Sequence, residues 1–428
     1  MEIAAVILGI GSNIVKILAV SWWAILPVGL FFIWKDFWLW GMNRLWKSKI
    51  KWAFLEIKIP RNILKTPKAM ENVFSALYAI YYKPIGFEDI YFKGKARLWF
   101  SCELAGYGGE VHFYIRCPQI FRNLAESAIY SEYPDAEIGE AEDYTENMPE
   151  VLPNETYDLW GADYILAREN PYPIKTYEFF EESIDERRLD PIAAITEVMS
   201  RLKEGEAIWI QYLINPVPNE WKKEGEAIRD KMMERRKEKP AGFFEALIAG
   251  LAKFLKNLSF AAAEYPVWAQ EKKKEEKFKF LVLSPGEKNI LEGVDNKISK
   301  LGFEAAIRFI YIDRRDSYSP ANVAAVDGAF RQFNTLDMNS FRVISETKTY
   351  VTARKLTHKS WFRKQKIFYR QRQIYEAYKL RWFPPKFSIL NSEELATIFH
   401  FPLVSVEAPL VRRLETKKGE PPSDLPME

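Results

Sequence analysis

Residues 53–60 read Ala-Phe-Leu-Glu-Ile-Lys-Ile-Pro, and polar and apolar side chains alternate along this stretch from Leu55 to Ile59. A period of two is typical of a strand that buries one face. Thr66 and Pro67 follow and predict the start of a helix, because proline is favoured in the first helical turn. Apolar residues at positions 70, 73, 74, 77 and 81 give that helix one buried face. A half-buried strand followed by an amphipathic helix is therefore expected.

The next segments extend this pair into a complete unit. Residues 98–104 and 111–115 predict two strands around the glycine-rich turn 105–109. A helix beginning at Pro118 and a short strand near 136–138 complete the order β-α-β-β-α-β. This order is the split βαβ, or ferredoxin-like, arrangement. Residues 53–143 are therefore predicted to form a first ferredoxin-like domain.

A looser copy of the same order is predicted over residues 174–345, after an acidic linker at 144–173. Its strands are expected at 175–180, 207–214, 303–312 and 341–344, and its helices at 190–203 and 321–333. Residues 220–300 form a helical insertion between the middle strands. A basic, aromatic helical region at 346–403 and a polar tail at 404–428 follow. The predicted fold class is α+β: one N-terminal transmembrane helix, then two ferredoxin-like domains.

The transmembrane prediction rests on residues 1–52. Half of the chain's 14 tryptophans lie in or beside the apolar run at 17–34, which would span about 27 Å as a helix. Tryptophan favours the membrane–water interface, so the candidate membrane-interface residues here are Trp22, Trp23, Trp38 and Trp40. The basic flank after the run predicts that the bulk of the chain is cytosolic.

The composition of the chain argues against several kinds of functional site. The 428 residues carry a net charge of +3, so the chain as a whole is not a polycation built to wrap nucleic acid. Two cysteines and three histidines are too few for a disulfide framework or a thiolate zinc site. The sequence contains no Gly-x-x-x-x-Gly-Lys-[Ser/Thr] string for phosphate binding. No catalytic residue, cofactor or metal is assigned, and the chain is not expected to be an enzyme.

An amphipathic segment lies inside the insertion. Its apolar side chains recur at helical spacing, and those taken as candidate membrane-interface residues are Phe244, Leu247, Leu251 and Leu255. The same pattern suits burial against the chain's own domain or a partner helix. Both interpretations stay open at this point.

A dense basic stretch runs from residue 348 to 386 and is interleaved with aromatic side chains. Proteins that follow a phosphate backbone and stack bases use this combination. A solvated basic helix face, or one docked on an acidic partner, has the same composition. The candidate contact residues for nucleic acid or a partner are Arg354, Lys355, Lys359, Arg363, Lys364, Arg370 and Arg372.

Several longer strings carry a family resemblance. They are residues 55–61, 67–74, 109–116, 133–137, 332–336 and 391–402. On these strings the chain resembles the N-terminal, motor-less half of the membrane-anchored, type IV secretion coupling-protein-like (TraG/TraD-like) ATPases of small-genome bacteria. In such relatives a hexameric motor domain follows a stretch similar to residues 417–422.

The resemblance implies a location at the bacterial cytoplasmic membrane and a role in DNA transfer by a type IV secretion or conjugation apparatus. The expected function is a membrane-tethered adaptor that positions a coupling-protein-like hexameric ATPase. The alternative is a membrane-bound module that binds single-stranded nucleic acid without a motor partner. The expected partners are a P-loop ATPase of the TraG/TraD type, the lipid bilayer and single-stranded DNA, and the chain is expected to form a homo-oligomer.

Overall fold

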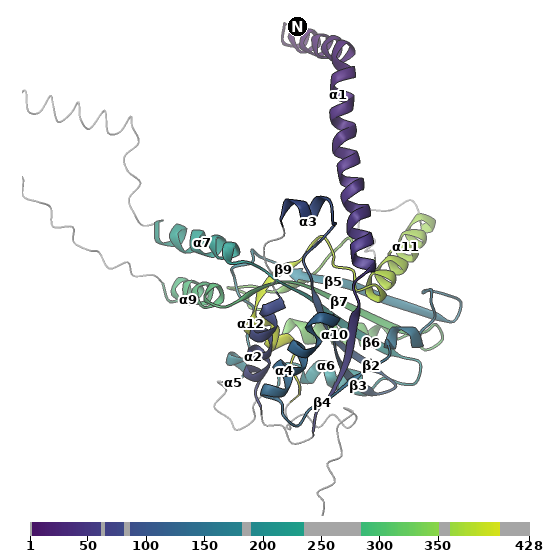
Figure 1. The fold of residues 1–428 in the computed structure, drawn as a ribbon, viewed down its shortest axis with the longest axis vertical. Coiled ribbons are helices and arrows are strands. Elements are labelled where there is room, and N and C mark those ends of the chain that lie inside the picture. Colours follow the sequence, from purple (N-terminus) through teal and green to yellow (C-terminus); the bar gives the residue numbers. More distant parts are fainter. Residues whose placement is uncertain are drawn as a thin grey trace, which may run out of the picture.

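A computed structural model describes residues 2–60, 65–80, 86–181, 190–234, 284–350 and 360–402. Within these residues, nine strands form one antiparallel sheet, with eight of them in the order β4-β1-β3-β2-β6-β7-β5-β8 and β9 paired to β7 (Figure 1). The class is therefore α+β, as the sequence predicts.

The first half of the sheet follows from the alternating pattern at residues 53–60. Strand β1 (Trp52–Lys58) buries Leu55 and Ile57 and pairs with β3 (Glu110–Pro118) and β4 (Glu137–Glu140). Strand β2 (Phe100–Tyr107) pairs with the other side of β3. Helices α2 (Pro67–Leu77) and α4 (Arg122–Glu132) connect these strands, and the short 3-10 helices η1 (Tyr78–Ile80) and η2 (Gln119–Phe121) adjoin them.

The second half repeats the same strand order. It contains β5 (Tyr157–Leu166), β6 (Ala207–Pro216), β7 (Gly302–Arg314) and β8 (Phe341–Val343). Helices α6 (Ala193–Ser200) and α10 (Pro320–Arg331) lie between them in sequence.

The first strand of this half is not where the sequence predicted it. Residues 175–180 enter the short helix α5 (Glu178–Glu181), whereas β5 lies inside the predicted acidic linker at 144–173. Acidic and proline residues on either side of β5 obscure the buried side chains of Leu159 and Tyr164 in a local reading of the sequence. The 3-10 helix η3 (Tyr144–Asn147) is the element that follows β4.

The two halves share one sheet, because β2 pairs with β6 from Phe100↔Ile214 to Tyr107↔Ala207. This pairing covers two strand edges that would otherwise expose unpaired backbone groups. The predicted fold class, a transmembrane helix followed by two ferredoxin-like domains, is corrected to a single nine-stranded antiparallel sheet with flanking helices.

Helices cover the two faces of the sheet unequally. The larger core lies on the face covered by α2, α4, α6, α10 and α12 (Ser392–Ile398). The opposite face holds a smaller core, in which Trp209 and Ile310 of the sheet pack against α11 (Ser360–Lys379). Strand β9 (Ser388–Asn391) follows α11 and pairs with the first residues of β7.

The insertion between β6 and β7 is described at both ends. It begins with η4 (Asn219–Trp221) and α7 (Lys222–Glu234) and ends with α9 (Pro285–Ser299). A capping box starts α9, since the Ser284 side chain accepts from the Glu287 backbone N–H and the Glu287 side chain accepts from that of Ser284. The candidate residues Phe244, Leu247, Leu251 and Leu255 lie outside the described residues.

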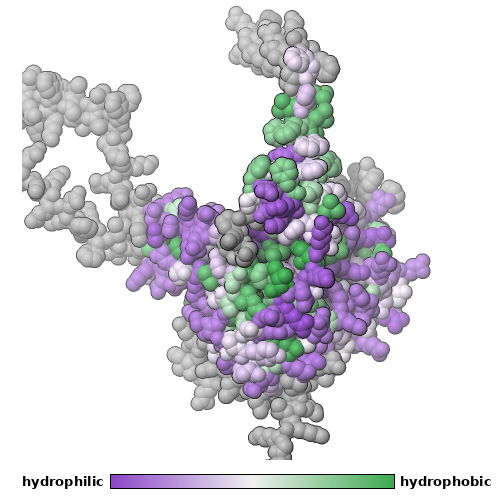
Figure 2. All heavy atoms as spheres, in the orientation of Figure 1, coloured by the Kyte–Doolittle hydropathy of each residue, from purple (hydrophilic) through white to green (hydrophobic). Residues whose placement is uncertain are grey.

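Helix α1 (Glu2–Ser48) extends away from the sheet, and Figure 2 shows hydrophobic side chains on its described portion. Its base contacts α3 (Phe87–Tyr91), where the Trp38 Nε1–H donates to the Tyr91 carbonyl oxygen at 2.8 Å. Of the helices in the described ranges, none combines the length and the apolar character that a membrane crossing requires. Among the described residues, the structure therefore does not support the predicted transmembrane helix.

Candidate functional site

Helix α11 carries the predicted contact residues that the structure describes. Arg363, Lys364, Arg370 and Arg372 all lie on this helix, whereas Arg354, Lys355 and Lys359 lie outside the described residues. The side chains of Lys364 and Arg372 are exposed, and those of Arg363 and Arg370 are half-buried. The structure thus brings four of the seven candidates together on one element.

One side of α11 is anchored on the sheet. Gln371, Ile374, Tyr375 and Tyr378 are buried, at the spacing of one helix face. The Gln371 Nε2 donates to the Leu159 carbonyl oxygen at 2.6 Å, and the Tyr375 hydroxyl donates to the Pro149 carbonyl oxygen at 2.8 Å. These contacts fix the rotation of the helix and so decide which side chains face solvent.

The solvent-exposed positions of α11 carry aromatic rings among basic residues. Phe368 is 43% exposed and Tyr369 is 61% exposed. The Arg372 guanidinium lies 4.6 Å from the Phe368 ring centroid, which is cation–π distance. We call Lys364, Lys366, Phe368, Tyr369 and Arg372 the α11 face. Its composition, positive charge with accessible rings, suits the phosphates and bases of a single strand.

A buried charged network holds the chain just after α11. Arg381 has a φ of 49° and is 1% exposed. Its Nε and Nη2 lie 3.1 Å from the two Glu103 carboxylate oxygens, and it also pairs with Asp143. The Tyr144 hydroxyl donates to Glu103 Oε2 at 2.8 Å.

Burial alone would raise the pKa of Glu103. The charge of Arg381 and its hydrogen bonds outweigh burial and lower the pKa of this carboxyl below its ordinary 4.5. Arg381 belongs to the basic stretch by sequence, but it is a structural cation rather than a surface contact. The one signal in the sequence is Glu103, an acid inside an apolar strand that needs a buried partner.

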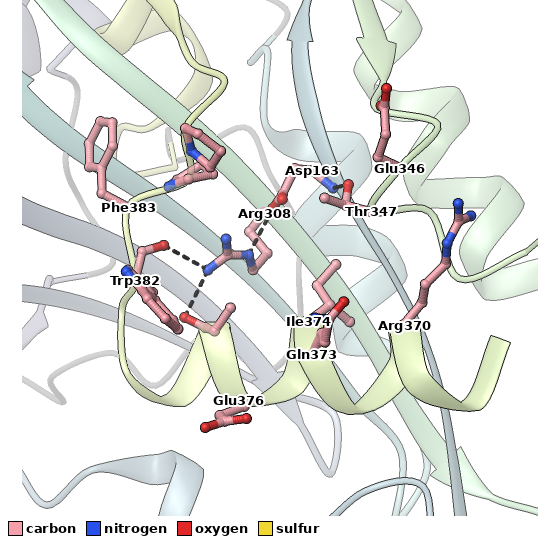
Figure 3. A pocket seen from close by; sticks show the side chains of 13 residues that line it. Asp163, Arg308, Glu346, Thr347, Arg370, Gln373, Ile374, Glu376, Trp382 and Phe383 are labelled. Carbon is pink, nitrogen blue, oxygen red and sulfur yellow. Dashed lines mark hydrogen bonds and ion pairs between the residues drawn. The ribbon is translucent and has the colours of Figure 1, made fainter. Parts of the chain in front are cut away.

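A cavity of about 520 Å³ lies between α11 and the segment that follows it (Figure 3). We call it the α11 pocket. Its walls are mainly apolar and include Ile374, Trp382 and Phe383, and its polar lining includes Asp163, Arg308 and Arg370. Sequence reasoning missed this pocket, because Asp163 and Arg308 are 145 residues apart and meet only through the pairing of β5 with β7.

Arg308 is the buried cation of the pocket. Its Nε donates to Asp163 Oδ1 at 2.7 Å, and its Nη1 donates to the carbonyl oxygens of Ala377 at 2.8 Å and Trp382 at 3.3 Å (Figure 3). The same guanidinium thus ties the end of α11 to the sheet. Its Nη2 makes no hydrogen bond to a residue that the structure describes.

In the described part of the chain, the cysteines are buried and the histidines contact carboxylates. Burial raises the pKa of the Cys102 thiol well above its ordinary value and that of Cys117 to about 11, so neither is a thiolate near neutral pH. His112 Nδ1 lies 2.8 Å from Glu56 Oε1, and His400 Nε2 lies 2.9 Å from Asp190 Oδ1. Across the described ranges, no group of three His, Cys, Asp or Glu side chains is placed to hold a metal ion.

The membrane-interface candidates on α1 are partly described. Trp23, Trp38 and Trp40 are exposed, and the side chain of Trp22 lies outside the described set. Their contact with lipid, and the location at the cytoplasmic membrane, stay predictions.

These features define an α+β protein with an exposed basic, aromatic helix and an adjoining pocket on one face of a single sheet. The chain belongs to the family described as domain of unknown function DUF8128, whose model matches residues 47–411. That range includes the sheet, α11 and the pocket. No curated protein matches the chain.

Proposed function

We propose that this chain is an adaptor in DNA transfer, which holds single-stranded DNA on the α11 face and positions a P-loop ATPase of the TraG/TraD type. The observation that carries the DNA contact is the α11 face itself. Lys364, Lys366 and Arg372 supply positive charge, while Phe368 and Tyr369 expose rings on the same helix. Basic residues attract phosphates, and any base can stack on a ring.

The rigid attachment of α11 to the sheet supports the proposed DNA contact. A binding helix that is ordered before contact loses less conformational entropy on binding. Helix α11 is held by the buried residues Ile374, Tyr375 and Tyr378 and ends at the Arg381–Glu103 ion pair. The face therefore presents charge and rings at fixed spacing.

The ATPase partner follows from the TraG/TraD-like resemblance. In the resembling proteins the motor is joined to a similar half-chain by a peptide bond. By analogy, we expect such a motor to lie next to this chain.

The second candidate function, a single-strand-binding module that acts without a motor, shares the α11 face. It differs in what accompanies the chain in the cell. Recovery of a P-loop ATPase with the tagged full-length chain favours the adaptor, and DNA binding with no ATPase favours the module.

The DNA contact is tested with the full-length chain and a fluorescent oligonucleotide over a series of salt concentrations. Replacing Lys364, Lys366 and Arg372 with Ala removes up to three phosphate contacts, so the slope of log affinity against log salt should fall by roughly 2. The matched control replaces with Ala three exposed cations: Lys288 on α9, Arg201 at the C-terminal cap of α6 and Arg331 on α10.

The control variant should keep the wild-type slope, because these cations lie away from α11. Equal slopes for the wild type and the α11 variant would overturn the DNA contact. The adaptor part fails separately if the tagged chain recovers no ATPase from cells that express one, or if the pure chain itself hydrolyses ATP.

A further inference from the structure

We propose that the α11 pocket receives one nucleobase, turned out of a strand that lies on the α11 face. This inference rests on the DNA contact of the proposed function and names the chemical group recognised beside it. The pocket and the face share one helix, since Arg370, Gln373 and Ile374 of α11 line the pocket.

The walls of the pocket suit a flat ring. Ile374, Phe383, Pro384 and Pro385 form apolar surfaces, and Trp382, which is 55% exposed, stands beside Phe383 in the same wall (Figure 3). A base has two apolar faces and a polar edge. Stacking on an indole covers a face without selecting one base over another.

The floor of the pocket suits the polar edge. The Asp163–Arg308 pair leaves Asp163 Oδ2 as an acceptor and Arg308 Nη2 as a donor, neither of which bonds to a described residue. Neither atom is sealed from solvent, although both side chains are almost fully buried. The Watson–Crick edge of each base carries a donor beside an acceptor, which is how enzymes read an extruded base.

Charge also favours a base over a free anion. Asp163 already balances Arg308 at 2.7 Å, so an anion at the floor would meet a carboxylate as well as a guanidinium. The other acids of the pocket do not crowd the floor. Glu346 pairs with Lys386 at 3.0 Å, and Glu376 extends from α11 away from Arg308 (Figure 3).

The test uses the full-length chain and a short oligothymidylate with a single 4-thiothymine, which crosslinks on irradiation to the residues that touch it. The adduct should map to the segment 382–385. Trp382→Ala should lower both crosslink yield and oligonucleotide affinity by about tenfold, as loss of one stacking partner does. The matched control is Leu380→Ala, a nearby side chain that is also exposed and does not line the pocket.

Two further arms separate the outcomes. An oligonucleotide from which every base is removed should bind the wild type more weakly than the normal strand does. This abasic strand should bind the wild type and Trp382→Ala with equal affinity. Thymidine monophosphate distinguishes a free nucleotide from a base in a strand, because competition by the monomer at millimolar concentration shows that the pocket accepts either source.

The nucleobase pocket is overturned if adducts map only to Phe368 and Tyr369, or if abasic and normal strands bind equally. In that case a salt slope reduced by the α11 substitutions would still support the proposed function. Absence of binding by oligonucleotide and monomer alike would overturn both.

Discussion

Arg381 lies in the basic stretch of the sequence, yet it is buried and helps to fix the position of α11. Among the basic residues after position 348 it is enclosed between Glu103 and Asp143, and it fixes the turn that ends α11. Its positive φ is uncommon for a residue with a side chain, so the ion pairs hold a backbone conformation that Arg381 would rarely adopt alone.

The first prediction concerns this residue. Arg381→Met should lower the free energy of unfolding by about 3–5 kcal/mol, because it leaves the Glu103 carboxylate buried without its cation. Urea unfolding measures the change. Arg331→Met removes an exposed ion pair with Asp327 and should cost less than about 1 kcal/mol. A similar loss in both variants would contradict the structural role of Arg381.

The second prediction is a pH dependence with a definite sign. Arg381 holds the folded pKa of Glu103 below its ordinary 4.5, so the unfolded chain binds more protons as the pH falls through that range. The stabilisation that ionised Glu103 gives the folded state is complete above pH 4.5, and it is lost as the pH falls through the folded pKa of Glu103. Between pH 7 and pH 3, the midpoint temperature of thermal unfolding should therefore fall less steeply in Glu103→Gln than in the wild type. An identical decline in the variant would mean that Glu103 does not contribute.

At the scale of one element, different residues of α11 are expected to serve folding stability and DNA binding. Ile374 is buried in the smaller core, whereas Phe368 faces solvent six residues earlier on the helix. Ile374→Ala should therefore lower the free energy of unfolding by about 2–4 kcal/mol. Phe368→Ala should change it by less than about 0.5 kcal/mol and should weaken single-stranded DNA binding. Urea unfolding and fluorescence anisotropy measure the two effects, and a large stability loss in Phe368→Ala would show that this ring packs.

At the scale of the whole molecule, pairing of β2 with β6 joins the two halves into one core. Side chains of both halves, such as Phe74 and Phe303, are in ring contact across that core. We predict a single cooperative unfolding transition. The backbone amides of β3 and β7 should therefore show the same free energy of opening for hydrogen exchange. Native-state hydrogen exchange measures both. Two separate transitions would instead restore the prediction of two independent domains.

The strands that the sequence located correctly are those with a strong local pattern. The alternation at 53–60 predicted β1, and the apolar run at 207–214 predicted β6. A strand buried on one face shows its period of two wherever it lies, so no knowledge of its partner is needed. Strand β5 has the same property, but the acidic residues around it masked the signal. The predicted transmembrane helix is not supported by the described residues.

By itself the sequence determined the α+β class, the positions of most strands and the helical character of α11, because these depend on side-chain period and on residues at helix ends. Tertiary structure alone decided that β2 and β6 join, that Arg381 is buried while Arg372 is exposed, and that Asp163 and Arg308 line one pocket. The reason is physical: strand edges and buried charges are satisfied by groups far away in the chain. Neither local propensity nor composition records which distant groups those are.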